Sequence, residues 1–332
     1  MVKAFSLFSG GLDSLLAARV VMEQGVDVTA LHFITPFFGY KNKGKEALAA
    51  GDFKEKYGLR VRIIDVSPEY MGMVKKPVYG YGKNFNPCLD CKIFMMKKAR
   101  ALMLEEGADF IISGEVLGQR PMSQRRDAMS IIERDSGLKG RLLRPLCAKL
   151  MPPTIPEEKG LIDRERLYGF SGRSRRDQIN LAAEFGIKDY ATPAGGCMLT
   201  DPVLSKRIRE FFCKREEAVD ARDIQLLTAG RFFRFPGGTL HVGRNESDNE
   251  KLVSLAGERE VIIRARDVPG PVSVFRGSPT EGEIELAARI TARYSDNGGL
   301  DFMAMEVSSG QETRTIQTRP APVSLVEELK AG

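Results

Sequence analysis

A pair of glycines, Gly10 and Gly11, stands between a short apolar run at residues 2–8 and a helical pattern at residues 12–24. The stretch reads Ser9-Gly10-Gly11-Leu12-Asp13-Ser14. Glycines permit a sharp turn and a close approach to a ligand, and the free N–H groups at a helix start attract anions. The stretch therefore predicts a strand, a phosphate-binding loop and a helix, in that order.

Asp13 is the unusual member of this loop, because a carboxylate repels an anion. We interpret it as facing a Mg²⁺ ion that bridges phosphates, with the hydroxyls of Ser9 and Ser14 as further donors. The loop is neither a Walker loop nor the glycine fingerprint of dinucleotide-binding folds. The alternative is a plain strand-to-helix turn in which Asp13 is a favourable acid in the first turn of the helix.

Strand and helix patterns alternate over the first 115 residues. Strands are expected at 2–8, 26–34, 60–66 and 109–113, and helices at 12–24, 43–57 and 88–106. Such alternation predicts a parallel sheet with right-handed crossovers, whose ligands bind at the carboxyl ends of the strands. After a proline-rich connection, a further helix is expected at 174–185.

The pattern changes near residue 200. Helices are expected at 203–215, 218–228 and 281–294, a hairpin at 230–242, and short strands at 260–265, 272–275, 301–307 and 312–317. A length of 332 residues suits about two domains of ~150 residues each. We predict an α/β domain with a parallel sheet over residues 1–200 and a smaller α+β domain over 201–332. No run approaches the ~18 apolar residues of a membrane span, and the N-terminus lacks a secretory pattern, so we expect a cytoplasmic protein without a membrane partner.

The number of cysteines is odd, which argues against a disulfide framework and for free, metal-bound or catalytic thiols. The chain has two histidines, so His-rich metal sites and a Ser-His-Asp hydrolase are unattractive. We expect two of the cysteines, Cys147 and Cys213, in the core. The five cysteines are Cys88, Cys91, Cys147, Cys197 and Cys213.

Cys88 and Cys91 form a Cys-x-x-Cys at a helix start, where the helix dipole and Lys92 should lower the pKa of both thiols. Cys197 follows two glycines, which free its backbone to bring the sulfur into a cleft. Three such cysteines suit a [4Fe–4S] cluster with one open iron, or a catalytic pair with a neighbour. Zinc with a fourth ligand and buried structural cysteines are the alternatives.

Positive charge is concentrated in the middle of the chain. Residues 117–176 hold 14 Lys and Arg against 7 Asp and Glu, which accounts for the whole net charge of +6. A concentrated basic segment fits a polyanionic partner, while an ordinary solvated surface is the alternative.

The loop Ser9–Ser14 resembles the signature of the PP-loop ATP pyrophosphatases, which have the adenine nucleotide alpha-hydrolase-like fold. These enzymes split ATP between the alpha and beta phosphates and adenylate a substrate oxygen. The resemblance implies that the adenine lies over the end of the second strand, around Ala30 and Phe33. It also implies that the pyrophosphate is held by Ser9, Gly10, Gly11, Asp13 and Ser14.

The combination of this loop with the cysteines resembles the tRNA 4-thiouridine synthases and 2-thiouridylases over about residues 1–200. Asn86-Pro87-Cys88 is similar to the 2-thiouridylases, and the stretch from Ser113 to Gln119, followed by Ser123-Gln124, is similar to the 4-thiouridine synthases. The resemblance implies that Gly114 and Gln119 border the nucleotide and the uridine, and that Cys197 is the late sulfur-carrying cysteine.

The expected activity is ATP-dependent thiolation of a tRNA uridine, with Asp13, Cys88 and Cys197 as catalytic residues. ATP and Mg²⁺ are implied, and the extra Cys91 favours a [4Fe–4S] cluster on Cys88, Cys91 and Cys197 over a persulfide relay. Sulfide or a persulfide derived from a cysteine desulfurase would supply the sulfur.

The segment from Gly230 to Leu252 resembles the NFACT-type RNA-binding domain. Arginines interleaved with Phe232, Phe233 and Phe235 offer cations for phosphate and rings for bases, although we expect the rings to lie in the core. We expect RNA contacts from Arg120, Arg125, Arg126, Arg173, Arg175, Arg176, Arg231, Arg244 and Asn245.

Two other functions keep some of these features. An ATP-dependent amidating ligase would use the same loop, with the cysteines binding zinc. A non-catalytic RNA-binding adaptor would use the C-terminal domain and an inert ATP site.

Overall fold

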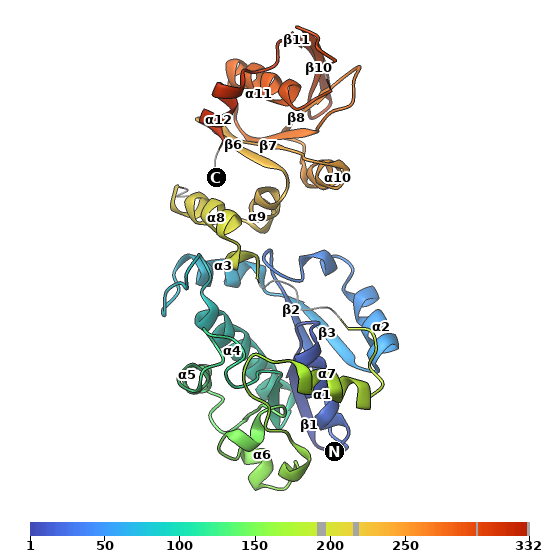
Figure 1. Ribbon diagram of the computed structural model, residues 1–332, viewed down its shortest axis with the longest axis vertical. Coiled ribbons are helices and arrows are strands. Elements are labelled where there is room, and N and C mark those ends of the chain that lie inside the picture. The colour runs from blue at the N-terminus through green and yellow to red at the C-terminus, as the bar shows by residue number, and fades with distance from the viewer. Residues whose placement is uncertain (191–196, 215–218, 297, 331–332) are drawn as a thin grey trace. The chain divides into compact units, whose positions relative to one another are not determined.

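The computed structural model describes residues 1–190, 197–214, 219–296 and 298–330 (Figure 1). The chain divides into two compact units, Met1–Asp201 and Pro202–Gly332. The expected loop at residues 192–196 and the side chain of Cys213 lie outside what is described. Among the described residues, no helix combines the length and the apolar character that a membrane crossing requires.

The first unit is built on a five-stranded parallel sheet, as the alternating pattern predicts. The strands run in the order β3-β2-β1-β4-β5. The chain therefore moves outward from β1 in one direction and returns to β1's other side at β4. Ligands of such sheets bind at the carboxyl ends beside this reversal. The strands are β1 (Lys3–Leu7), β2 (Asp27–Ile34), β3 (Arg60–Asp65), β4 (Phe110–Ser113) and β5 (Leu142–Leu143).

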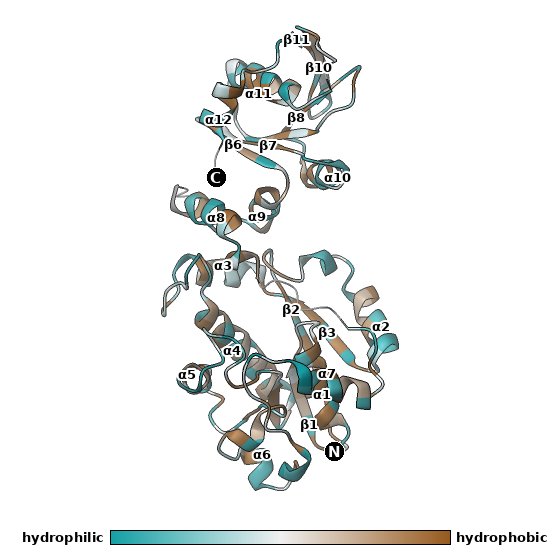
Figure 2. Cartoon of the chain, in the orientation of Figure 1, coloured by the Kyte–Doolittle hydropathy of each residue, from teal (hydrophilic) through white to brown (hydrophobic). Residues whose placement is uncertain are grey.

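Helices cover both faces of this sheet. Ala4, Val28 and Ile112 pack with α1 in one core cluster, and α7 packs against α1. The pleat turns Phe5 and Ile111 to the other face, where α4 contacts β1 and β4. Figure 2 shows β1 and β2 as largely hydrophobic, as strands covered on both faces must be. The helices of this unit are α1 (Leu12–Met22), α2 (Glu46–Tyr57), α3 (Ser67–Lys75), α4 (Cys88–Glu106), α5 (Arg126–Ser136), α6 (Ile155–Glu158) and α7 (Arg176–Glu184).

The second unit holds a six-stranded antiparallel sheet in the order β11-β10-β8-β9-β7-β6. The expected hairpin is β6 and β7, and Gly238 is required there because a Cβ would lie 2.1 Å from the carbonyl oxygen of Arg276. The strands are β6 (Arg231–Phe235), β7 (Gly238–Val242), β8 (Val261–Ala265), β9 (Ser273–Gly277), β10 (Met303–Ser309) and β11 (Glu312–Thr318). The helices are α8 (Pro202–Lys214), α9 (Ala221–Thr228), α10 (Glu246–Leu255), α11 (Glu281–Arg293) and α12 (Val323–Leu329).

Short elements are where the sequence prediction is wrong. It misses α3, α5, β5, α6, α10 and α12, and it treats the start of α6 as part of a non-helical connection. It starts α2 and α9 three residues early, and α7 and β10 two residues early. Apart from the four-residue α6, the missed helices have 7 to 11 residues, and their patterns stand among charged residues that resemble loop sequence. The long, strongly periodic elements are correct to within a few residues.

Candidate nucleotide and cysteine site

The glycine loop lies between β1 and α1. Gly10 has a positive φ of 79°, which favours glycine, and Gly11 is the residue that precedes α1. The Oγ of Ser14 donates to the carbonyl oxygen of Gly11 at 2.8 Å and accepts from the backbone N–H of Ser9 at 3.2 Å. These bonds hold the turn in a shape that presents the start of α1 to the carboxyl edge of the sheet.

The Asp13 carboxylate is held from two directions. Its Oδ2 accepts from Nε2 of Gln119 at 2.8 Å and pairs with the guanidinium of Arg175 at 2.9 Å. Its Oδ1 is buried, and no described residue donates a hydrogen bond to it. Oxygen ligands are what Mg²⁺ prefers, so a buried carboxylate oxygen without a donor fits the cation that the sequence suggested.

Gly114 joins the end of β4 to this loop. A Cβ at Gly114 would lie 2.5 Å from the carbonyl oxygen of Asp13 and 2.6 Å from the backbone nitrogen of Ser14. Real Cβ atoms do not approach backbone so closely, so only glycine allows this contact. The close approach brings the segment that ends at Gln119 beside the phosphate loop.

A second segment reaches the loop from far along the chain. Ser171 pairs with Leu117, and Nε2 of Gln178 donates to Oε1 of Gln119 at 3.1 Å. Arg175 lies within this segment, directly before α7. The sequence grouped Arg175 with the arginines that contact RNA, whereas the structure places its guanidinium on the carboxylate of the phosphate loop.

The two residues expected near the adenine lie on β2. Ala30 is in the middle of the strand with its side chain in the core, and its place beside the adenine stays a prediction. Phe33 lies at the strand end and is 5% exposed. Between them, His32 is a neighbour that the sequence analysis missed. Its Nδ1 hydrogen-bonds the carbonyl oxygen of Phe8 at 2.9 Å, and burial lowers the pKa of its imidazole.

Cys88 and Cys91 stand in the first turn of α4. The hydroxyl of Tyr70, on α3, donates to the sulfur of Cys91 at 3.1 Å, and the amide of Asn86 donates to the sulfur of Cys88 at 3.1 Å. Asp90, between the cysteines, accepts the backbone N–H groups of Val78 and Tyr79 at 2.7 and 3.0 Å. Asp90, which lies between the two cysteines, therefore anchors the loop at residues 76–87 to the first turn of α4.

Cys197 is linked to the loop at residues 76–87, which precedes α4. The side-chain amide of Asn84 donates to the carbonyl oxygen of Thr200 at 2.6 Å, and the hydroxyl of Thr200 donates to the carbonyl oxygen of Cys197 at 2.6 Å. Burial raises the pKa of the Tyr70 hydroxyl well above its usual value, and the charges of Cys91, Cys197 and Cys88 raise it further. Tyr70 therefore contacts the sulfur of Cys91 directly, and the charges of all three cysteines act on its hydroxyl.

The expected lowering of the thiol pKa is wrong for Cys91. No lowering was expected for Cys197. Burial raises the pKa of Cys91 and raises the pKa of Cys197 to about 12. Lys92 does favour the Cys91 thiolate, but its ammonium lies 3.6 Å from the carboxylate of Glu115. Desolvation outweighs the nearby positive charge.

The donor set decides which groups these cysteines suit. Within the described ranges, no group of three or more His, Cys, Asp or Glu side chains is arranged to hold a metal ion. Cysteine thiolates are the usual ligands of iron–sulfur clusters, and a bound cation would offset the burial that disfavours the thiolate of Cys197. The residues present fit such a cluster in chemistry.

A buried ion network behind the site was not found from the sequence. The Glu115 carboxylate is 1% exposed and pairs with Arg144 at 3.0 Å, and Arg144 also pairs with Glu133. Burial opposes the charge on Glu115, but Lys92 and Arg144 outweigh it and lower the pKa of its carboxyl. Glu115 follows Gly114 and pairs with Lys92, which follows Cys91, so the pair connects the two predicted site motifs. The sequence offered one signal for this network, because Lys92 and Glu115 are charged residues that adjoin two predicted site motifs.

The other arginines assigned to RNA in the first unit are exposed. Arg125 pairs with Asp127 at 2.6 Å, and Arg126 donates to the carbonyl oxygen of Leu150 at 3.0 Å. The exposed set in this unit is Arg120, Arg125, Arg126, Arg173 and Arg176.

In the second unit, the residues assigned to RNA also have partners within the unit. The guanidinium of Arg231 lies 4.1 Å from the ring centre of Tyr294, and Arg244 pairs with Asp248 at 2.6 Å. The side chain of Asn245 accepts from the backbone N–H of Asp248 and so caps α10. Phe232 and Phe233 are buried, as expected.

The sheet order and the two-glycine loop after β1 define the first unit as a PP-loop domain of the α/β class. Residues 2–149 match the family described as thiamine biosynthesis protein (ThiI), and residues 230–329 match the NFACT protein RNA binding domain. The resemblance to the PP-loop tRNA thiouridine synthases, with an NFACT-type domain in the second unit, is confirmed.

Known proteins are similar to part of the chain. A probable tRNA sulfurtransferase of Thermococcus kodakarensis is 34% identical over 145 residues, which cover 43% of this chain and 36% of that protein. The tRNA-specific 2-thiouridylase MnmA of Petrotoga mobilis is 30% identical over 130 residues, 35% of each chain. A solved 4-thiouridine synthetase–RNA complex with bound ATP is 22% identical, with a TM-score of 0.41 over 68% of this chain and 52% of that one. The chain spans about a third of the length of the curated relatives it matches.

Proposed function

We propose that this chain is an ATP-dependent tRNA sulfurtransferase that makes thiouridine. The observation that carries the proposal is the contact chain from the phosphate loop to the cysteines. Gly114 touches the backbone of Asp13 and Ser14, and the next residue, Glu115, pairs with Lys92, which adjoins Cys91. A nucleotide loop and a set of thiols at one edge of one sheet suit a reaction that activates with ATP and finishes with sulfur.

The reaction takes two steps. The uridine carbonyl oxygen bonds to the alpha phosphorus of ATP, and pyrophosphate leaves. The sulfur nucleophile then bonds to the carbon of that carbonyl group, and AMP leaves with the oxygen. The N–H groups and hydroxyls of Ser9–Ser14 hold the pyrophosphate, and Asp13 would hold a Mg²⁺ ion, which would offset the charge of the pyrophosphate. Gly114 and Gln119 border the nucleotide, and Phe33 borders the adenine.

Cys88, Cys91 and Cys197 would hold the [4Fe–4S] cluster, which would supply an open iron that binds sulfide. The tRNA backbone contacts the exposed arginines of the first unit and three residues of the second: Arg120, Arg125, Arg126, Arg173, Arg176, Arg231, Arg244 and Asn245. Affinity for tRNA should then fall steeply with salt, because each phosphate contact releases counterions.

The test is anaerobic incubation of the purified chain with tRNA, Mg–ATP and sulfide, followed by digestion and mass spectrometry. Thiouridine should form with AMP and pyrophosphate in equal amounts. Cys197→Ser should abolish thiouridine, whereas Cys147→Ala, at a core position, should retain it. Cleavage of ATP with ammonia incorporation and no sulfur would replace the proposal with the amidating ligase.

Iron and acid-labile sulfide analysis tests the cluster separately. About four irons per chain, lost in Cys91→Ala, are expected. If reconstituted protein holds no iron, the cluster is refuted and a persulfide on Cys197 becomes the sulfur carrier.

A further inference from the structure

The ion pair between Arg175 and Asp13 joins two residues that are 162 positions apart, at the point where the nucleotide phosphates are expected. Both side chains are mostly enclosed, at 23% and 14% exposure. Oδ2 of Asp13 already has two donors, from Arg175 and Gln119, while Oδ1 has none among the residues described. Both hydrogen bonds therefore fall on one oxygen of Asp13, and the other oxygen is available to a cation.

The surroundings make this pair sensitive to a nucleotide. Arg175 and a magnesium ion are both cations, so they compete for the Asp13 carboxylate. A polyphosphate presents a denser negative charge than one carboxylate, and a guanidinium binds phosphate oxygens in pairs. A nucleotide that arrives with its cation therefore offers the phosphates to Arg175 and the magnesium ion to Asp13. Each of these is a stronger partner than the other residue of the ion pair.

We propose that Arg175 is a phosphate-binding residue that exchanges partners: it neutralises Asp13 in the empty site and moves to the phosphates when Mg–ATP brings a cation to Asp13. The inference rests on the proposed function only in taking ATP as the nucleotide.

The backbone around Arg175 is fixed, so the exchange belongs to the side chain. Gly172 donates its N–H to the carbonyl oxygen of Leu117 at 2.8 Å, and Gln178 binds Gln119. These contacts hold the residues on both sides of Arg175 against the segment that follows β4. A long side chain on an anchored segment can change partners while the chain stays in place.

The first experiment compares nucleotide affinities by titration of the purified chain in the presence of Mg²⁺. Arg175→Ala should weaken ATP binding about tenfold, the loss of one charge-assisted contact, and should change AMP binding less than about twofold. Arg166→Ala is the matched control, because it removes an exposed arginine of the same unit that donates to the carbonyl oxygen of Glu23, and it should leave both affinities unchanged.

The second experiment tests the exchange itself in EDTA. Asp13→Asn should bind metal-free ATP more tightly than wild type, because it removes a negative charge and frees Arg175. If the partners exchange, most of that gain disappears when Asp13→Asn is made on the Arg175→Ala background. An equal gain with and without Arg175 means that the pair does not exchange, and it overturns the proposal.

Two other results also overturn it: wild-type ATP affinity in Arg175→Ala, or equal losses of ATP and AMP binding, which mark a structural role. If Arg175→Ala fails to fold, Arg175→Lys and Arg175→Gln decide. Lysine should lose less ATP affinity than glutamine, because it keeps the charge that binds phosphate although it lacks the paired donors, and equal affinities refute the role. Thiouridine formation is not measured, so a failure of the proposed tRNA activity leaves this result standing.

Discussion

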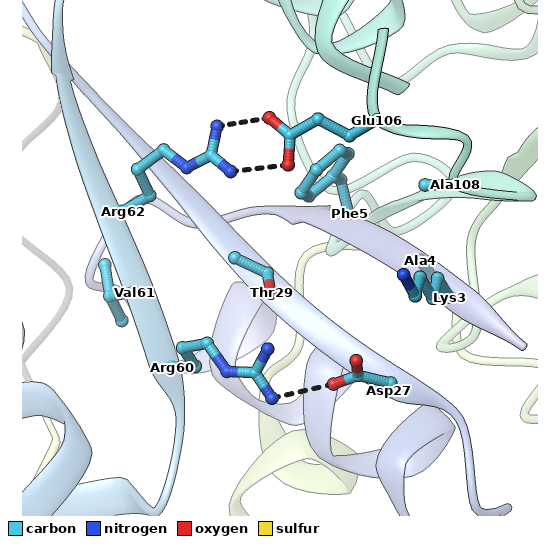
Figure 3. A pocket seen from close by; sticks show the side chains of 10 residues that line it. All are labelled: Lys3, Ala4, Phe5, Asp27, Thr29, Arg60, Val61, Arg62, Glu106 and Ala108. Carbon is cyan, nitrogen blue, oxygen red and sulfur yellow. Dashed lines mark hydrogen bonds and ion pairs between the residues drawn. The ribbon is translucent and has the colours of Figure 1, made fainter. Parts of the chain in front are cut away.

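The two ends of the parallel sheet differ in how their charges are satisfied. The amino end carries a pocket of about 390 Å³ in which four of the five charged residues form two ion pairs (Figure 3). Arg62 binds both carboxylate oxygens of Glu106, at 2.6 and 2.7 Å, and Arg60 pairs with Asp27 at 2.8 Å. At the carboxyl end, one oxygen of Asp13 is buried with no donor from the described residues.

This difference shows that buried polar atoms without a hydrogen-bond partner identify the candidate site better than the presence of a pocket does. The amino-end pocket has shape and charge, yet its ion pairs are complete. The carboxyl end has buried acceptors and thiols in a desolvated place, so its charges need a cation or a ligand to be balanced. The predictions below test whether the two ends differ in energy as they do in bonding.

The largest effect is expected from the buried ion network. Arg144→Met should lower the free energy of unfolding by about 3–5 kcal/mol, because the buried Glu115 would lose its hydrogen-bonded partner and keep only the more distant Lys92. Urea unfolding measures this. A loss below about 1 kcal/mol would mean that the carboxyl-end pair is no more important than an exposed one.

Asp13→Asn should lower the rate of tRNA-dependent pyrophosphate release roughly 100- to 1,000-fold, because the neutral amide is a poor ligand for the cation that stabilises the leaving group. The matched variant is Asp27→Asn at the amino end, which should stay within about twofold of wild type, since its pair with Arg60 is exposed. Equal losses in both variants would erase the contrast between the ends.

Gly114→Ala should destabilise the fold by about 1–3 kcal/mol and weaken ATP binding, because the new Cβ overlaps the backbone of Asp13 and Ser14. Gly51, within α2, is the control: nothing lies within 4 Å of its Cβ position, so Gly51→Ala should stabilise the helix by about 0.5–1 kcal/mol. Thermal melts with and without ATP report both effects. Wild-type stability of Gly114→Ala would refute the close contact.

The smallest effect is expected at the amino end. Arg62→Met should cost at most about 1 kcal/mol, because the Arg62–Glu106 pair is 40% and 38% exposed, and it should leave ATP affinity unchanged. The measurement is urea unfolding beside an ATP titration. A changed ATP affinity would show that the pocket in Figure 3 communicates with the nucleotide site.

The fold of the first unit was predictable because its signals are local. Glycines at the turn after β1 and the alternation of strands with helices follow from short-range preferences. The loop Ser9–Ser14 and the Cys88–Cys91 pair were found the same way, although their roles remain predictions.

The contacts that complete the site were not predictable, because they join distant residues. Asp13 meets Arg175 across 162 positions, and Asn84 meets Thr200 across 116. In the sequence, Arg173, Arg175 and Arg176 are equivalent cations, and only the packing of the segment before α7 separates one from the others. The thiol pKa values also depend on burial, which the helix position of Cys91 does not reveal.

The bond between Asn84 and Thr200 has a consequence for how the protein is made. Synthesis proceeds at roughly 5–20 residues per second, so Cys197 is added on the order of 5–20 s after Cys91. During that interval the emerging chain carries the Cys88–Cys91 pair but no third thiol and no Thr200 for Asn84 to hold. Any metal group that needs all three cysteines must therefore be inserted after the first unit is complete, not while the chain is being extended.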